Sequence, residues 1–164
     1  MMKYETCSAE ETFSLGRALG EHLRAGDIVL LHGDLGVGKS VLTRGLARGC
    51  GIDEPMPSPT FTLMTAYKGR IPFYHFDLYR LEGPDEYFEA GLDEFIGGDG
   101  AAAIEWPEQA ELAFDQCLEV TIARVPGNDD AREVTICLRG LDARADELRA
   151  ALEKWGGRHE HPVH

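Results

Sequence analysis

The sequence predicts an α/β fold, with a mixed parallel and antiparallel sheet that is flanked by helices on both faces. Three observations predict it. The run Ile28–Leu31 is wholly apolar, as expected for a strand that is covered on both faces, and it leads into a glycine-rich loop. Segments with helical periodicity alternate with strand-like segments along the chain. Two pairs of strand-like segments are separated only by short turns, which is typical of antiparallel hairpins.

The first half of the chain is predicted to hold two helices and three strands. In chain order, these elements cover residues 8–25, 28–31, 40–50, 61–67 and 71–76. Ser8 and Glu11 have capping-box spacing at a helix start, and apolar residues follow at helical spacing. Gly51 ends the second helix, and three prolines predict irregular structure over 52–60. Pro72 places the last of these strands at a sheet edge or at a strand start.

The second half is predicted to hold two helices and three strands. In order, they cover residues 83–96, 101–104, 117–125, 132–138 and 141–155. The first is acidic with an apolar side, and the second is a short apolar run of the buried-strand type. The turn at 126–129 joins the next two strands into a hairpin. Because no linker or internal repeat interrupts the pattern, we expect one domain over 1–155, followed by a polar tail at 156–164.

The composition restricts the function classes. The chain has 164 residues with 16 Lys and Arg against 29 Asp and Glu, which gives a formal net charge of −13. A chain of this length buries roughly 68–70% of its unfolded surface, so its core needs no disulfides or bound metal to be stable. Nucleic-acid affinity comes mainly from Lys and Arg that displace counterions, so direct binding of DNA or RNA is not expected. Any polyanion that the protein binds must be held by a local binding site rather than by a basic surface.

The chain shows no feature of export or of a membrane segment. No apolar run approaches the roughly 18 residues of a membrane helix. The N-terminus has no apolar signal core, so we expect a cytoplasmic protein. The cysteines stand far apart without CxxC spacing, which argues against zinc and favours reduced thiols. They are Cys7, Cys50, Cys117 and Cys137.

The strongest motif is the glycine-rich loop after the first buried strand. Gly33-Asp34-Leu35-Gly36-Val37-Gly38-Lys39-Ser40 matches G-x-x-x-x-G-K-[ST], the phosphate-binding loop (P-loop). The glycines allow positive φ and close backbone approach, so that N–H groups and the start of the next helix face a phosphate. Lys39 supplies a charge to the β- and γ-phosphates, and the Ser40 hydroxyl can bind Mg²⁺. The expected strand–loop–helix order is the one that P-loop proteins require.

Two carboxylates stand at the ends of predicted strands. Asp77 ends the strand over 71–76, and Glu105 follows the strand over 101–104. Ligands of open α/β sheets bind at this edge, so either carboxylate could face the phosphates. From spacing alone, a cap or a plain surface carboxylate is an equally good interpretation of each. His32 and His75 are interpreted as structural.

Four segments together resemble one family. They are the loop 33–40, Ser58-Pro59-Thr60-Phe61-Thr62-Leu63, Phe76-Asp77-Leu78-Tyr79-Arg80-Leu81, and Glu105-Trp106-Pro107. In this order and spacing they resemble the bacterial TsaE (YjeE) family. Members are small P-loop ATPases of the threonylcarbamoyladenosine (t6A) modification of tRNA. The resemblance covers roughly residues 8 to 140.

The resemblance implies site residues and a nucleotide. ATP or ADP would be bound by Asp34, Leu35, Gly36, Val37, Gly38, Lys39, Ser40, Val41 and Trp106. Mg²⁺ would be held by Ser40, Asp77 and Glu105, and which of the two carboxylates binds it stays open. The catalytic residues would be Lys39, Thr60, Asp77 and Glu105, with Thr60 near the γ-phosphate.

One position departs from the family pattern. The family commonly has a second hydroxyl residue after the P-loop Ser or Thr, and here Val41 stands there. A neutral hydrogen bond contributes about 0.5–1.5 kcal/mol, so somewhat weak nucleotide binding is expected.

The expected function is an ATPase that supports the t6A complex, is slow alone and is stimulated by TsaD-like and TsaB-like partners. One alternative is a small-molecule P-loop kinase with an arginine lid. Only Arg139, Arg144 and Arg149 could form such a lid, and a solvated helix face is the better interpretation of them. A second alternative is a non-catalytic module whose nucleotide selects a docking conformation. For this second alternative, the loop 58–63 and the acidic segment 83–96 are the surfaces expected to respond.

Overall fold

The computed structural model describes residues 1–57, 62–155 and 158–159. The strands of this part are β1 (Met2–Thr6), β2 (Ile28–His32), β3 (Met64–Lys68), β4 (Pro72–Asp77), β5 (Ala101–Glu105), β6 (Cys117–Val125), β7 (Asn128–Arg139) and β8 (Arg158–His159). The α-helices are α1 (Ala9–Gly20), α2 (Lys39–Gly49), α3 (Pro84–Glu89) and α4 (Ala145–Lys154). Short 3₁₀ helices are η1 (Leu92–Phe95), η2 (Pro107–Ala110) and η3 (Asp142–Arg144).

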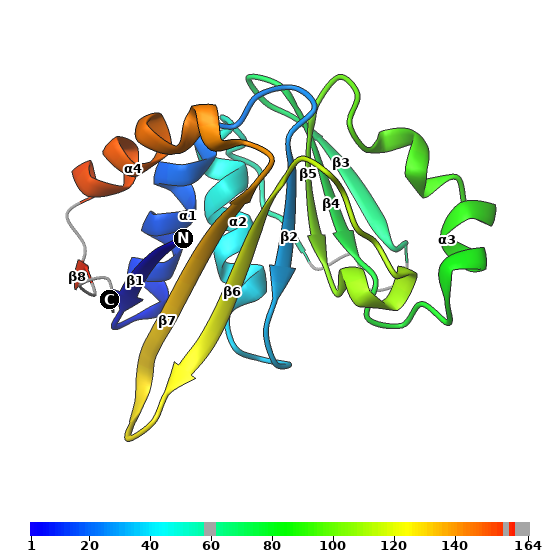
Figure 1. Ribbon diagram of the computed structural model, residues 1–164. Helices are drawn as coiled ribbons and strands as arrows, with labels where there is room; N and C mark the ends of the chain where they lie inside the picture. The colour runs from blue at the N-terminus through cyan, green and yellow to red at the C-terminus, as the bar shows by residue number, and fades with distance from the viewer. Residues whose placement is uncertain (58–61, 156–157, 160–164) are drawn as a thin grey trace.

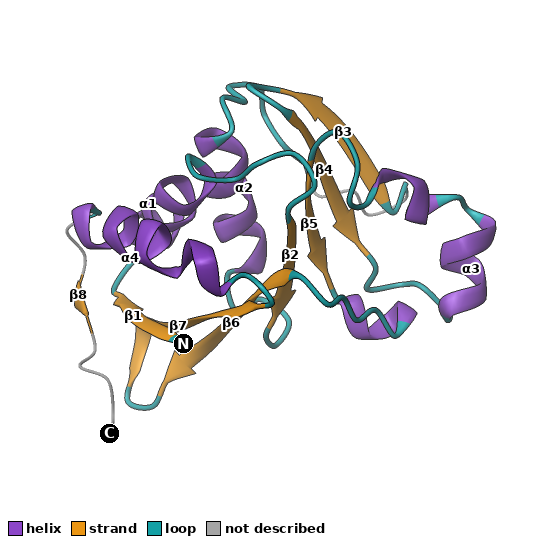
Figure 2. Ribbon diagram, turned by 45° about the horizontal axis from the view of Figure 1, so that its top comes forward, coloured by secondary structure: helices purple, strands orange, loops and turns teal. Residues whose placement is uncertain are grey.

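One twisted sheet forms the centre of the molecule. Its strand order is β3-β4-β5-β2-β6-β7-β1-β8. The pairs β4-β5, β5-β2 and β2-β6 are parallel, and the other neighbouring pairs are antiparallel. Helices α1, α2 and α4 cover one face, and α3 lies on the other side beside β3–β5 (Figures 1 and 2). The predicted mixed α/β fold with helices on both faces is confirmed.

The central strand β2 is buried from both sides, as its wholly apolar sequence predicts. Val29 and Leu31 belong to the core under α1, α2 and α4. Ile28 and Leu30 face the opposite way, into the core that includes Tyr87 of α3. Alternate residues of a strand point to opposite faces, so this one run supports two cores.

Several predicted details are confirmed. The Ser8 hydroxyl accepts from the Glu11 backbone N–H (3.1 Å) and caps α1. Both predicted hairpins form, and Pro72 begins β4. The second hairpin turns more tightly than predicted, because β7 already begins at Asn128. Helix α1 is also shorter than predicted and ends at Gly20.

The predicted helix over 83–96 is wrong as one element. Gly91 adopts φ +69° in the left-handed region and separates α3 from η1. Since a continuous helix cannot pass through that conformation, the segment forms two short helices instead, α3 and η1. None of the helices in the described ranges is long and apolar enough to span a membrane.

Two strands at the end of the sheet were not predicted. In β1, Met2, Tyr4 and Thr6 are buried, and β1 pairs with β7. On its other side β1 pairs with Arg158–His159, inside the segment expected to be a polar tail. The rest of that tail, 156–157 and 160–164, lies outside the described residues.

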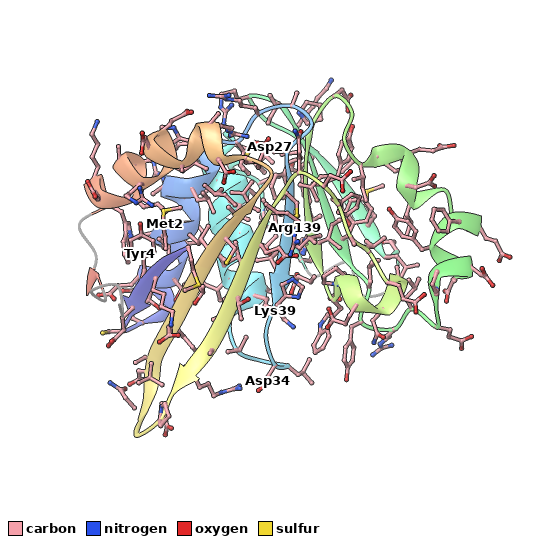
Figure 3. The ribbon with its side chains drawn as sticks, viewed as in Figure 1. Met2, Tyr4, Asp27, Asp34, Lys39 and Arg139 are labelled. Atoms are coloured by element: carbon pink, nitrogen blue, oxygen red, sulfur yellow. The ribbon has the colours of Figure 1, made fainter. Side chains whose placement is uncertain are left out.

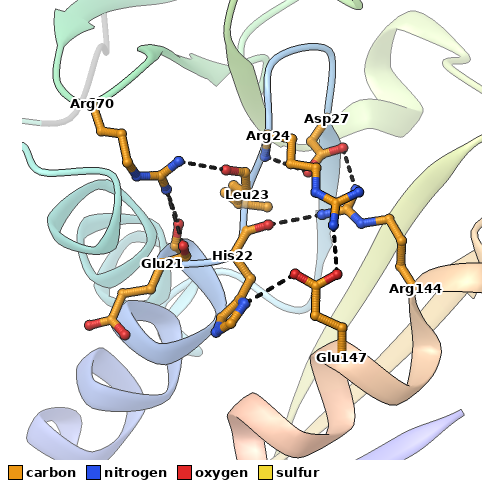
Figure 4. A network of polar contacts seen from close by, with 9 residues as sticks. Glu21, His22, Leu23, Arg24, Asp27, Arg70, Arg144 and Glu147 are labelled. Atoms are coloured by element: carbon orange, nitrogen blue, oxygen red, sulfur yellow. Dashed lines mark hydrogen bonds and ion pairs between the residues drawn. The ribbon is translucent and has the colours of Figure 1, made fainter.

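Arg144 corrects the prediction that the late arginines form a solvated face. Its side chain is buried, and Nη1 donates to Asp27 Oδ1 at 2.6 Å. Its Nη2 donates to the His22 carbonyl at 2.9 Å, in the network of Figure 4. Arg139 instead pairs with Glu119, and Arg149 lies 3.8 Å from Asp146. Arg144 therefore joins the α4 end of the chain to the turn before β2.

Candidate functional site: a phosphate-binding loop at the sheet edge

The glycine-rich loop joins β2 to α2, as predicted. Gly33 has φ +148°, and a Cβ there would lie 2.6 Å from the Ile122 carbonyl oxygen, so only glycine fits. Gly38 has φ +123° and stands at the N-cap of α2, where no side chain caps the helix. The first N–H groups of α2 therefore lack a side-chain acceptor, which suits them to an anionic ligand.

A hollow of about 320 Å³ opens over this loop. Its lining comes from the loop, the first turn of α2, the end of β4 and the end of β5. The residues are Leu35, Gly36, Gly38, Lys39, Ser40, Val41, Asp77, Tyr79, Glu105 and Trp106. Most of the sequence-predicted site residues thus meet in one place, and Tyr79 joins them. Of the others, Asp34 is exposed in the loop (Figure 3) and Val37 is buried in the core.

Lys39 lies across the hollow rather than out in solvent. Its Nζ donates to the Gly33 carbonyl oxygen at 2.5 Å and stands 3.4 Å from the centre of the Trp106 ring. Burial lowers the pKa of Lys39, while the nearby Glu105, Glu108, Asp77 and Asp34 charges oppose that shift. The ammonium group is held inside the hollow by a carbonyl and a ring face, ready for a stronger anionic partner.

The two strand-end carboxylates stand next to one another. Asp77 and Glu105 are register partners on the parallel strands β4 and β5. The Ser40 hydroxyl donates to Glu105 Oε1 at 3.1 Å, which links the start of α2 to the end of β5. Asp77 is half-buried, and its Oδ1 accepts from the Tyr79 N–H at 3.1 Å.

His75 has a contact that the sequence interpretation missed. Its Nε2 lies 2.5 Å from Glu105 Oε2, and the two side chains are 2% and 3% exposed. Its Nδ1 is buried without a hydrogen-bond partner among the described residues. Period two along β4 places His75 on the same face as Asp77, which was the available clue. His75 and Ser40 hold the two oxygens of Glu105.

Two arginines of the β6–β7 hairpin support the loop. Arg132 Nε donates to the Val37 carbonyl at 2.8 Å, and Arg124 Nη2 donates to the Leu35 carbonyl at 3.3 Å. Neither contact was predicted, because both join residues about ninety positions apart in the sequence. They fix the loop from the side opposite the carboxylates.

A second hollow of about 250 Å³ continues on the other side of the loop. It shares Gly36, Gly38 and Val41 with the first hollow. The start of α1 and the start of β7 complete it, the latter with the carboxylates of Asp129 and Asp130. The two hollows are therefore neighbours that share part of the loop as a common wall.

Other expected features lie elsewhere. Thr60 and its neighbours Ser58, Pro59 and Phe61 lie outside the described residues. Arg44 and Arg48 are exposed on the far turns of α2, beside a hollow that includes Met56 and none of the loop. Both arginines are therefore exposed on a part of α2 that does not contact the loop.

The first hollow contains oxygen donors of the kind that hard cations such as magnesium take. No group of three or more His, Cys, Asp and Glu side chains suited to a metal occurs within the ranges the structure covers. The hollow instead brings together the Ser40 hydroxyl and the carboxylates of Asp77 and Glu105. Mg²⁺ is usually bound by one or two carboxylates together with phosphate oxygens and water. This donor set therefore suits Mg²⁺ that arrives with a nucleotide.

Comparison with known proteins gives one consistent result. The model of the family described as "Threonylcarbamoyl adenosine biosynthesis protein TsaE" matches residues 6–134. The TsaE protein of a Nostoc species is 42% identical over 141 residues, 83% of this chain and 85% of that protein. The Bacillus subtilis TsaE protein is 39% identical over 85% of this chain and 87% of its own length.

The fold comparison agrees with the sequence comparison. The crystal structure of Bacillus subtilis YdiB superimposes with a TM-score of 0.74 at 32% sequence identity, covering 95% of this chain and 96% of that one. The shared region includes the strand, loop and helix of the phosphate site and both strand-end carboxylates, since these all lie within residues 6–134. The chain belongs to the TsaE family of threonylcarbamoyl adenosine biosynthesis proteins.

Proposed function

We propose that this chain binds ATP with Mg²⁺ and hydrolyses it, slowly when alone, in support of the t6A modification of tRNA. The family's role in t6A biosynthesis supports the biological assignment. The observation that carries the chemistry is a single hollow. It combines the uncapped start of α2, the ammonium group of Lys39, and the oxygens of Ser40, Asp77 and Glu105.

The loop would hold the phosphates through backbone N–H groups. A phosphate oxygen would compete with the neutral Gly33 carbonyl for the Lys39 ammonium, and it would win because its negative charge adds an ion pair to the hydrogen bond. The ribose and base would extend into the second hollow, where Asp129 and Asp130 can accept from ribose hydroxyls. ADP and ATP would share these contacts.

Ser40, Asp77 and Glu105 would hold Mg²⁺. The ion would neutralise charge on the phosphate oxygens. His75 would keep the Glu105 carboxylate turned toward Ser40, because its ring nitrogen contacts the other carboxylate oxygen. The site would thus hold the Glu105 carboxylate in one orientation.

Hydrolysis would proceed by in-line attack of water on the γ-phosphate. Lys39 would stabilise the charge that develops on the phosphate oxygens, and a carboxylate or Thr60 would orient the water. No arginine lines the first hollow within the described part of the chain, so slow intrinsic turnover is expected. TsaD-like and TsaB-like partners would complete the catalytic site or a later step of the ATPase cycle.

Lys39→Ala tests this proposal. Loss of a charge-assisted contact should weaken ATP binding by about 1.5–3 kcal/mol, roughly 10- to 150-fold. Titration calorimetry measures the binding, and phosphate release with and without purified TsaD and TsaB measures hydrolysis. Lys68→Ala, an exposed lysine on the edge strand β3, is the control and should behave as wild type. Undiminished hydrolysis by Lys39→Ala would refute the role of Lys39.

A further inference from the structure

Another hollow, of about 440 Å³, lies on the α3 side of the sheet, away from the glycine-rich loop. We call it the α3 groove. One wall comes from α3 and η1, including Phe88 and Ile96, and the other from the end of η2 and residues 111–114. The Phe88 ring is 58% exposed at this groove and stands edge-on to the buried Tyr87. A large, half-exposed aromatic ring beside an apolar hollow is typical of an interaction site.

The chain segment that forms the groove carries charges of one sign. Residues 81–116 contain eleven Asp and Glu and no Lys or Arg. Two of these carboxylates, Asp93 and Glu111, line the groove itself. Negative charge therefore borders the apolar hollow, and it favours a partner surface that is positively charged.

The groove is joined to the phosphate site by one short segment. Trp106, which contacts Lys39, is followed directly by η2, and Ala110 at the other end of η2 lines the groove. Both flanks of η2 turn sharply, since Trp106 has φ +60° and Glu111 has φ +53°. The Gln109 side chain also donates to the Tyr79 carbonyl at 3.0 Å, beside the Tyr79–Trp106 ring contact. A side chain seated in the groove would touch the segment that carries Trp106.

We propose that the α3 groove docks a partner protein that inserts an apolar side chain from within a patch of Lys and Arg. This inference rests on the proposed function, because it concerns the partner of the same nucleotide site. The acidic residues of the α3 groove argue against two other occupants, a second copy of this chain and a nucleic acid. A second copy would bring a chain of net charge −13 against an acidic rim, and a nucleic acid would bring phosphates. A basic protein surface is attracted by the same rim.

Two variants test the groove, and a third is their control. Phe88→Gln removes the exposed ring, and Glu89→Lys with Glu111→Lys reverses charge beside the groove. Asp146→Lys with Glu153→Lys makes the same charge change on α4, which covers the other face of the sheet (Figure 1). Binding of each protein to the purified TsaB–TsaD pair is measured by interferometry at low and high salt. ADP binding without partners is measured alongside.

Phe88→Gln should weaken partner binding by about tenfold or more, as for a central aromatic contact. The groove charge reversal should weaken it more at low than at high salt, because surface charges are screened. The α4 control should bind within about threefold of wild type. All variants should bind ADP as wild type does, since none touches the loop.

The outcomes separate the two proposals. Wild-type binding that persists unchanged in both groove variants, while Lys39→Ala still loses ATP, would overturn the groove and leave the proposed function standing. Equal losses in the groove and α4 charge variants would also overturn it, since only net charge would then matter. Failure of the wild type to bind the TsaB–TsaD pair would contradict the partner part of the proposed function, and the groove assignment with it.

Discussion

Val41 occupies the first turn of α2, where it lines both hollows of the phosphate loop. A hydroxyl at this position would face the nucleotide from between the two hollows. Val41→Thr should therefore tighten ADP or ATP binding by about 0.5–1.5 kcal/mol, the contribution of one neutral hydrogen bond. Titration calorimetry checks this. Val41→Ala removes the same apolar group without adding a hydroxyl and should show no gain; equal or weaker binding by Val41→Thr contradicts the prediction.

Asp77 and Glu105 differ in their surroundings, and this separates their roles. Asp77→Asn should weaken nucleotide binding in the presence of Mg²⁺ by about 1.5–3 kcal/mol, with little change without the ion. The free energy of unfolding should hardly change, because Asp77 is only half-buried. Calorimetry with ADP, with Mg²⁺ and with EDTA, measures the difference. An unchanged Mg²⁺ dependence would remove Asp77 from the metal site.

Glu105→Gln should act on stability as well as on Mg²⁺. The carboxylate is buried and contacts His75 and Ser40, so its loss leaves polar groups poorly paired inside the protein. A buried group left without its charged partner costs about 1–3 kcal/mol. A urea melt of Glu105→Gln beside Asp77→Asn checks this, and equal midpoints for the two variants would argue against the buried network.

At the scale of elements, α1 and α2 pack closely enough to require glycine. A Cβ on Gly45 of α2 would lie 2.2 Å from the Phe13 carbonyl oxygen of α1, and one on Gly20 of α1 would lie 2.2 Å from the Leu46 carbonyl oxygen of α2. Because backbone atoms cannot move aside as a side chain can, the two helices must separate to admit a methyl group. This contact fixes how closely α2 lies against α1.

Gly45→Ala should therefore destabilise the protein. Overpacking costs about 1–3 kcal/mol, which outweighs the gain of up to about 1 kcal/mol that alanine brings to a helix interior. Urea denaturation measures the change in the free energy of unfolding. Gly98→Ala is the matched control, because a Cβ there meets nothing within 4 Å. It should stay within about 0.5 kcal/mol of wild type, and an equal stability of the two variants would refute the close-packing argument.

At the scale of the whole molecule, burial of weak acids predicts loss of stability in alkali. Burial raises the pKa of the Cys50 thiol to about 11 and that of Tyr87 to about 12. In the unfolded chain these groups lose their protons nearer their ordinary pKa values of 9.0 and 10.0. The folded state binds more protons over this range, so stability is fully present below pH 9 and is lost as the pH rises toward 11–12.

Urea melts at pH 7.5, 9 and 10.5 test this behaviour. The free energy of unfolding should fall with rising pH, by roughly 1.4 kcal/mol for each unit that separates a folded from an unfolded pKa. The double variant Cys50→Ala with Tyr87→Phe should lose less over the same range. Other buried groups with raised pKa, such as Tyr4 and Cys117, leave a remaining slope. A slope identical in both proteins would contradict the assignment.

The sequence alone determined the glycine-rich loop and much of the sheet. Ile28–Leu31, the glycines after it and Lys39 are neighbours in the chain, so their strand, turn and helix are set by local conformation and apolar pattern. The two hairpins are likewise local. For the same reason, Asp77 and Glu105 could be recognised as strand-end carboxylates.

Only the tertiary structure decided which distant residues meet. Met2–Thr6 carries a short period-two alternation that the prediction overlooked, and pairing with β7 is what makes these five residues a strand. His75 on Glu105, Arg132 on the loop, and Arg144 buried on Asp27 all depend on contacts across many residues of chain. A charged side chain is buried where folding brings it to a hydrogen-bond or ion-pair partner. The hydrophobic periodicity and the composition of the sequence do not show where that partner lies. The loop could therefore be predicted from sequence, whereas its supports and the α3 groove are properties of the packed molecule.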